Sequence, residues 1–221
     1  MYLDLIGPEK IRNGVGYLNV VTGGMKADKT KHFAGLFDRL RHTDIKMQIF
    51  KPKCDFRREL HEKYDIPRGY TVSRTGLYVP SEEIDDKGDL SDLVQEIDLN
   101  NEIFGFEEVH LYDKSEKVVN ICLWLKYEHK KTVVTSLLDR NFRGEPYKAA
   151  QDLMSNANGT DKLFGWCDVK GCNEVGEMSQ RLIDGQPAPW DDVEKLVGAS
   201  ETYEARCMNH HEVPGKPRYT V

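Results

Sequence analysis

The chain has 221 residues, 39% of them hydrophobic, which is enough for one sizeable core and a small accessory lobe. Acidic side chains number 37 and basic ones 31, so the net charge is -6 and the pI is near 5.7. A protein with this balance has no global positive field, which excludes a general attraction to nucleic acid or anionic lipid.

Hydropathy and cysteine content indicate where the protein works. No stretch approaches the length of a membrane span, and the first residues lack the pattern of a secretory or transit peptide. The five cysteines are an odd number and too few for a disulfide scaffold, and three of them lie near the C-terminus beside a histidine pair. We therefore expect a cytoplasmic protein with a metal site, without membrane association and without a nucleic-acid partner.

Hydrophobic periodicity and turn residues predict alternating strands and helices. Before residue 100 these are a strand at 16–22, a turn at Gly23-Gly24, a helix within 29–42, strands at 45–50 and 70–79, an exposed acidic loop at 81–92 and a following helix. After it come a strand at 103–106, a helix around 118–125, a strand at 131–138 and a turn at Asn158-Gly159-Thr160.

The alternation of strands and helices implies an α/β fold with a parallel sheet and right-handed crossovers. We expect this α/β domain to span residues 1–160. From about Lys162 the character changes to short strands, glycines and cysteines, so a small metal-binding domain is expected at 161–221. Its Pro- and Gly-rich end, 213–221, is predicted to be a surface strap.

The first motif follows the strand at 16–22. Residues 23–30, GGMKADKT, occupy the phosphate-loop frame G-x-x-x-x-G-K-[ST], in which amides at a helix N-terminus, a lysine and a hydroxyl contact phosphates and Mg²⁺. The frame predicts a nucleotide-binding loop made of Gly23, Gly24, Met25, Lys26, Ala27, Asp28, Lys29 and Thr30.

Asp28 weakens that prediction. It stands where the frame has its second glycine, so it adds a Cβ where close backbone approach is wanted and a negative charge beside a polyanion. Lys26 could offset part of that charge. The alternative is an ordinary glycine turn in which Asp28 caps the following helix.

Two further motifs follow predicted strands. Glu107-Glu108 ends the apolar run IFGF, and in phosphate-loop proteins such carboxylates hold Mg²⁺ or act as a general base. Asp55 and Arg57 follow the strand at 45–50 and would lie near the same edge of a parallel sheet. The alternatives are a solvated strand end for the first pair and a surface ion pair for the second.

A metal cluster is predicted near the C-terminus. Cys167 and Cys172 are followed, with 34 residues between Cys172 and Cys207, by Cys207 and His210, and two short clusters of such ligands suit tetrahedral structural zinc. Four protein ligands leave no position for water, so the expected role is structural. The alternative is a set of buried apolar cysteines beside a surface histidine.

These motifs, in this order, resemble the zinc-containing (type II) thymidine kinases. The family's loop G-P-M-F-[SA]-G-K-[ST] is matched by residues 23–30, K-P-x-x-D-x-R by KPKCDFR at 51–57, and D-E-[AG]-Q-F by EEVHL at 107–111. Its L-D-x-x-F-R-G-x-P-F is matched closely by LDRNFRGEPY at 138–147. Together these segments and those near the C-terminus cover nearly the whole chain.

The C-terminal segments resemble the family's lasso, a metal-bound lid. K-L-x-A-x-C and T-Q-R-L-x-x-G-x-P-A are similar to residues 162–167 and 179–188. Val197-Gly198-Ala199, Tyr203 to Cys207, and His210 to Pro214 resemble the lasso of the bacterial members.

The resemblance implies an enzyme that moves the γ-phosphate of ATP to the 5′-hydroxyl of thymidine. Glu108 would take the hydroxyl proton, Lys29 and Arg57 would neutralise the transferred group, and Thr30 with Glu107 would hold Mg²⁺. Asp55 would belong to the same cofactor site. A homotetramer is implied as well.

The resemblance also implies a thymine pocket closed by the lasso, which structural zinc would hold in shape. The residues that would line it are Met25, Leu111, Phe142, Tyr147, Ser179 and Tyr203. The lasso would read the base edge through its main chain, so zinc would serve nucleoside binding indirectly.

Departures from the family pattern gather on the phosphate side. They are Asp28 for Gly, Glu107 for Asp, His110 for Gln, Leu111 for an aromatic residue, Arg74-Thr75 for His-Asp or His-Asn, and a two-residue insertion between Cys167 and Cys172. The alternative to an active kinase is therefore a diverged paralogue that binds a nucleoside or nucleotide with little or no phosphoryl transfer. A third reading is a zinc ribbon that binds nucleic acid, which the acidic charge disfavours.

Overall fold

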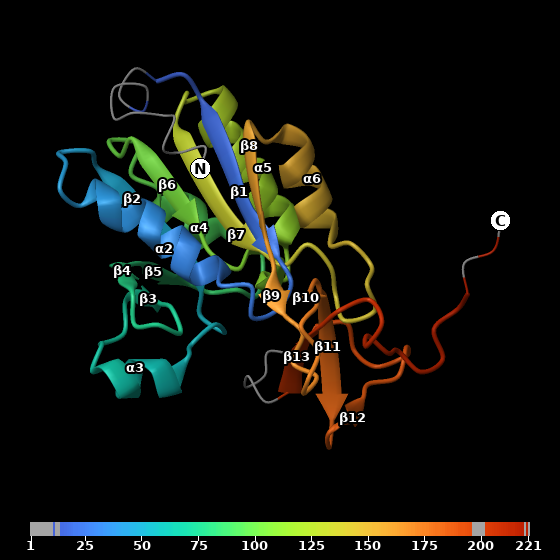
Figure 1. The fold of residues 1–221 in the computed structure, drawn as a ribbon. Helices are drawn as coiled ribbons and strands as arrows, with labels where there is room; N and C mark the ends of the chain where they lie inside the picture. Colours follow the sequence, from blue (N-terminus) through green and yellow to red (C-terminus); the bar gives the residue numbers. More distant parts are fainter. Residues whose placement is uncertain (1–10, 12–13, 196–201, 219, 221) are drawn as a thin grey trace.

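A computed structural model describes residues 11, 14–195, 202–218 and 220. A six-stranded, wholly parallel sheet in the order β5-β2-β6-β7-β1-β8 forms its centre (Figure 1). The strands are β1 (Tyr17–Gly23), β2 (Met47–Pro52), β5 (Glu82–Ile84), β6 (Ile103–Phe106), β7 (Thr132–Leu137) and β8 (Gly159–Leu163). Every residue of β6 and β7 is buried, as expected for strands covered on both faces.

Helices cover both faces of this sheet. α2 (Lys29–Leu40) packs in one apolar cluster with Val21, Ile49 and Val134. α5 (Ser115–Tyr127) and α6 (Lys148–Asn156) belong to the cluster on the other face. The interior glycine of β6 permits the close approach of α2, because a Cβ on Gly105 would lie 2.7 Å from the Phe37 ring.

The predicted parallel α/β fold is confirmed, as are the strands at 16–22, 45–50, 103–106 and 131–138 to within a few residues. Among the described residues, no helix is both long and apolar enough to cross a membrane. The shorter elements are α3 (Arg58–Tyr64), α4 (Ser91–Glu96) and the 3-10 turn η2 (Val109–Leu111).

Three expectations were wrong. The strand predicted at 70–79 is a hairpin of β3 (Tyr70–Val72) and β4 (Tyr78–Pro80), because Gly76, at φ 83°, turns the chain between them. The acidic loop predicted at 81–92 contains the edge strand β5, which pairs with β2. The turn predicted at 158–160 begins β8, because both main-chain polar groups of Leu18 bond to Asn158.

A small lobe follows β8 at the carboxyl end of the sheet (Figure 1). It holds the hairpin of β9 (Gly165–Trp166) and β10 (Val175–Gly176), and a sheet of β11 (Met178–Ile183), β12 (Gln186–Pro187) and β13 (Tyr203–Arg206). The described part of the tail lies on the surface, where Pro214 accepts a main-chain bond from Trp190. Val197-Gly198-Ala199 and two residues of the predicted strap, Tyr219 and Val221, lie outside the described residues.

Candidate active site

The segment that joins β1 to α2 has the backbone of a tight cradle. A Cβ on Gly23, at φ 142°, would lie 2.1 Å from the carbonyl oxygen of Leu163, so this position requires glycine. Lys26 and Asp28 have left-handed backbones, at φ 59° and φ 57°. Aspartate is one of the few residues with a side chain that tolerates this conformation, which explains how Asp28 can stand in place of a glycine.

Asp28 occupies the N-cap position of α2, but its side chain makes no capping hydrogen bond. The side-chain cap considered from the sequence is therefore wrong. Its carboxylate is exposed at the loop and makes no hydrogen bond or ion pair with any residue that the structure describes.

Lys29 and Thr30 begin α2 with their side chains buried. The Lys29 ammonium donates to the carbonyl oxygen of Gly24 at 2.9 Å and so closes the loop on itself. Burial lowers the pKa of Lys29, while the nearby charge of Glu108 opposes this shift. Lys29 therefore lies within electrostatic range of Glu108, as the sequence motifs predict.

Arg57 joins the two acidic motifs to the phosphate loop. Its guanidinium donates to Thr30 Oγ1 at 3.0 Å, to Glu108 Oε1 at 2.9 Å and to Asp55 Oδ1 at 3.0 Å. Burial opposes its charge, but Asp55, Glu107 and Glu108 outweigh burial and raise the pKa of Arg57 above its ordinary value. The surface ion pair that was the alternative for Asp55 and Arg57 is thus part of a larger polar group.

Glu107 lies behind this group. Thr30 Oγ1 donates to its Oε1 at 2.6 Å, while its buried Oε2 has no hydrogen-bond partner among the described residues. Burial raises the pKa of Glu107 to about 8. A buried, unpaired carboxylate oxygen beside a hydroxyl is the type of oxygen ligand that Mg²⁺ takes, so these residues fit a magnesium ion.

Glu108 lies at the mouth of the site and directly precedes η2. Its backbone is left-handed, at φ 50°. Its Oε2 lies 3.5 Å from His110 Nδ1, which at first sight is an ion pair. However, the Leu138 amide donates to that same Nδ1 at 3.3 Å, and burial holds the pKa of His110 well below its ordinary value. We therefore assign a neutral imidazole, which leaves Arg57 as the cation that pairs with Glu108.

A cavity of about 830 Å³ lies beside these groups, between the sheet and the small lobe. All six residues predicted to line a thymine pocket face it: Met25, Leu111, Phe142, Tyr147, Ser179 and Tyr203. The cavity is also lined by Lys26 to Thr30, Asp55, Arg57 and Glu108, whereas Gly23, Gly24 and Glu107 are not among its lining residues. The amide of Met25 donates to Ser179 Oγ at 3.0 Å and thereby joins the loop to β11.

Arg181, a residue to which sequence reasoning gave no role, supports this pocket. It is fully buried, with its guanidinium 4.4 Å from the Phe142 ring centroid and its Nε donating to the Tyr203 hydroxyl at 3.0 Å. It also pairs with Asp192 at 2.7 Å. The sequence indicated this role only through the place of Arg181 in the segment SQRL, because its partners Phe142, Asp192 and Tyr203 are distant from it in the chain.

The metal cluster assembles as predicted. One ligand atom from each of Cys167, Cys172, Cys207 and His210 lies within 4.8 Å of the other three. His210 Nδ1 is 3.5 Å from Cys167 Sγ and 3.2 Å from Cys207 Sγ. Ligands at ~2.0–2.3 Å from zinc in a tetrahedron stand ~3.3–3.8 Å apart, so the cluster fits one zinc ion.

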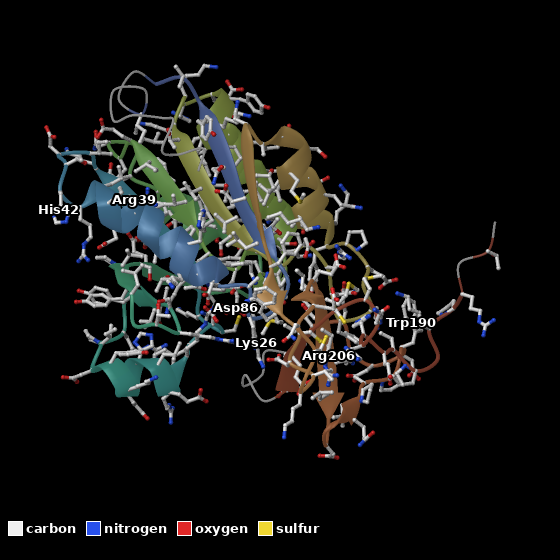
Figure 2. All side chains as sticks on the ribbon, in the orientation of Figure 1. Lys26, Arg39, His42, Asp86, Trp190 and Arg206 are labelled. Atoms are coloured by element: carbon white, nitrogen blue, oxygen red, sulfur yellow. The ribbon has the colours of Figure 1, made fainter. Side chains whose placement is uncertain are left out.

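Lys26 connects this lobe to the phosphate loop. Figure 2 shows Lys26 where the two parts of the molecule meet, and its ammonium lies 2.8 Å from Asp168 Oδ2. Asp168 follows the first metal-ligand position, and its carboxylate also accepts from the Ala205 amide in β13 at 2.7 Å. Lys26 is therefore engaged with the lobe through Asp168.

Comparison with known proteins gives a consistent result. The family model described as "Thymidine kinase" matches residues 16–211. A thymidine kinase of Ureaplasma urealyticum is 34% identical over 206 residues, which is 92% of this chain and 86% of the relative. A thymidine kinase of Coprothermobacter proteolyticus is 35% identical over 204 residues, covering 91% of this chain and 93% of that protein.

Proposed function

This chain belongs to the thymidine kinase family, and on that premise we propose that it transfers the γ-phosphate of ATP to the 5′-hydroxyl of thymidine. The observation that carries the proposal is the guanidinium of Arg57, which bonds at once to the phosphate-loop hydroxyl of Thr30 and to the carboxylate of Glu108. One cation thus joins the donor side of the cavity to the acceptor side.

We assign the chemistry of the acceptor to Glu108. It lines the cavity. Because the His110 imidazole beside it is neutral, the cation that pairs with Glu108 is Arg57. Glu108 accepts the proton of the 5′-hydroxyl as that oxygen attacks the γ-phosphorus, and the oxygen bridging the β- and γ-phosphates leaves with the electron pair of the broken bond. Because the carboxylate is held by Arg57, it is oriented before the nucleoside arrives.

The donor side rests on Arg57 and four further residues. Lys29 and Arg57 neutralise charge on the transferred phosphoryl group, while Thr30 and Glu107 are the residues that would hold Mg²⁺. When bound, Mg²⁺ neutralises charge on the β- and γ-phosphates. Asp55 keeps Arg57 in place from its far side.

The small lobe supplies the nucleoside pocket in this proposal. Phe142 and Tyr203 pack on the buried guanidinium of Arg181, which fixes the wall of the pocket opposite the phosphate loop. Zinc in the Cys167 cluster would hold β9 and β13 together and so act on nucleoside binding indirectly. The division into a nucleotide-binding domain at 1–160 and a lasso domain at 161–221 belongs to the same proposal, as does a cytoplasmic homotetramer, which sedimentation of the zinc-loaded protein would test.

The presence of Asp28 favours a second candidate function, in which the protein is a paralogue that binds nucleoside but transfers little or no phosphate. Its exposed carboxylate stands in the loop where a triphosphate would lie. In that case the pocket walls would still bind thymidine, while Mg²⁺-ATP binding would be weak or absent.

Two measurements on purified, zinc-loaded protein separate these functions. A coupled assay measures ADP formation with and without thymidine, and calorimetry measures the affinities for thymidine and for Mg²⁺-ATP. A kinase forms ADP only when thymidine is present and binds both ligands. Thymidine binding without ADP formation and without Mg²⁺-ATP binding would establish the paralogue.

A further inference from the structure

Arg74 lies in the turn of the β3-β4 hairpin, at the rim of the cavity. The turn is held in place, because Ser73 donates to the Leu77 carbonyl at 2.8 Å and the Tyr64 hydroxyl donates to the Arg74 carbonyl at 2.8 Å. Gly76 packs against the Tyr64 ring, where any Cβ would clash. The hairpin therefore presents Arg74 to the cavity from a fixed position.

Most other cations around the phosphate loop are already engaged. Lys26 pairs with Asp168, Lys29 bonds to Gly24, and Arg57 bonds to Thr30, Asp55 and Glu108. The guanidinium of Arg74 makes no hydrogen bond, ion pair or ring contact with any residue that the structure describes. Its side chain is therefore a cation at the cavity with no bonded partner in the part of the chain that the structure describes.

Two other cations of the cavity wall, Lys31 and Arg58, share this lack of a described partner and, like Arg74, are exposed. Arg74 differs from them in its place on the hairpin turn and in the charges that face it. Partial desolvation is the largest cause that lowers its pKa, the charge of Arg57 adds to that effect, and Asp28, Asp168 and Glu108 oppose it. Arg74 thus lies within electrostatic range of both the loop aspartate and the acceptor carboxylate.

Asp28 places a negative charge in the loop that a cation at this place can offset. A carboxylate close to a phosphate oxygen repels it, and an added cation at a similar distance opposes that repulsion. An arginine can also bind two phosphate oxygens at once through its planar fork.

We propose that Arg74 binds the phosphoryl groups of the donor nucleotide, and that its charge offsets the charge of Asp28 in the phosphate loop. This inference rests on the proposed kinase function and names the residue by which the altered loop still binds a triphosphate. Arg74 and Asp28 are then a functional pair, although they make no direct bond to each other.

A double-mutant cycle tests this pair. R74Q, R74K, D28G and the double variant D28G/R74Q are prepared as zinc-loaded proteins, and calorimetry measures the affinities for Mg²⁺-ATP and for thymidine. R41Q, which removes an exposed cation at the far end of α2, is the matched control. Thermal unfolding and zinc content show that each variant is folded.

We expect R74Q to weaken Mg²⁺-ATP binding by roughly 10- to 100-fold and R74K by less, with thymidine affinity and the R41Q control unchanged within about twofold. In the D28G background the same R74Q change should weaken binding by at least about fivefold less. Unchanged ATP affinity in folded R74Q would overturn the binding role, and an equal loss in both backgrounds would overturn the pairing with Asp28.

These outcomes differ from a failure of the proposed function. If R74Q loses ATP affinity but the wild-type protein forms no thymidine-dependent ADP, Arg74 binds the nucleotide of a non-catalytic paralogue. If the wild-type protein binds no Mg²⁺-ATP at all, both the donor site and the role of Arg74 are refuted.

Discussion

Lys26 and Asp168 form an ion pair of 2.8 Å that ties the phosphate loop to the metal lobe. The same carboxylate of Asp168 accepts a main-chain bond from Ala205, two residues before the metal-binding position Cys207. The carboxylate of Asp168 thus links the loop proposed to bind the donor to the lobe proposed to cover the acceptor, in addition to the bond between the Met25 amide and Ser179. Their energetic coupling can be measured.

Breaking this tether should weaken donor binding without removing it. The two side chains are 28% and 30% exposed, so the pair is worth only about 0–1 kcal/mol. We expect K26M and D168N each to weaken Mg²⁺-ATP binding by no more than about fivefold, and the double variant to lose less than the sum of both. Calorimetry on the four proteins provides the measurement. The exposed K87M variant is the control, and strictly additive losses would contradict the tether.

Loss of the proton acceptor should affect turnover far more than binding. Because E108Q keeps the size of the side chain but cannot take a proton, we expect kcat to fall by about 10²- to 10⁴-fold. Thymidine affinity, measured by calorimetry, should stay within about threefold of the wild-type value. E116Q, an exposed change in α5, is the control. A kcat for E108Q within about fivefold of wild type would assign the proton to another group.

Removal of one metal ligand should unfold or loosen the lobe. We expect the wild-type protein to bind one zinc ion per chain, and C172S, which leaves three ligands, to lose that zinc and to melt at a lower temperature. Thymidine affinity should fall with it, since the pocket wall belongs to the same lobe. C122A, which alters a buried cysteine of α5 far from the cluster, should keep the metal. Zinc analysis and thermal unfolding read out both variants, and full zinc content in C172S would refute the site.

His110 should make the protein less stable in mild acid. Because burial lowers its folded pKa below the ordinary value, the unfolded chain binds a proton at a pH where the folded protein does not. The stability contributed by the neutral imidazole is present above the unfolded pKa of about 6.5 and is lost as pH falls below it.

Urea unfolding at about pH 7.5 and about pH 5 measures this effect, since each pH unit below ~6.5 costs up to ~1.4 kcal/mol. H110Q can still accept the Leu138 amide bond and should lose less stability over this range than the wild-type protein. H42Q, a change at an exposed histidine, is the control. Equal losses in wild type and H110Q would show that this imidazole is not responsible.

The sequence predicted the parts of the molecule whose chemistry is local. The loop at 23–30 follows its strand and opens its helix as expected, and the metal ligands come together because cysteine and histidine in two short clusters have few other uses. The positions of Arg57 and Glu108 could be inferred as well, because parallel strands end at one edge of the sheet.

Elements that depend on distant partners could not be predicted. β5 carries Glu82 and Glu83, which read as loop, and it is a strand only because β2 offers it an edge. Asn158 has the composition of a turn but pairs with Leu18 across the sheet. The side chain of Arg181 is bonded to residues 11 or more positions away in the chain, so no local pattern predicts its role.

The proposed kinase function is tested most directly by transfer of label from γ-³²P-ATP to thymidine by the zinc-loaded wild-type protein, with E108Q measured in parallel. We expect labelled thymidine 5′-monophosphate from the wild-type protein and at least about 10²-fold slower labelling with E108Q. Wild-type protein that binds thymidine and Mg²⁺-ATP but leaves all label on ATP would contradict it.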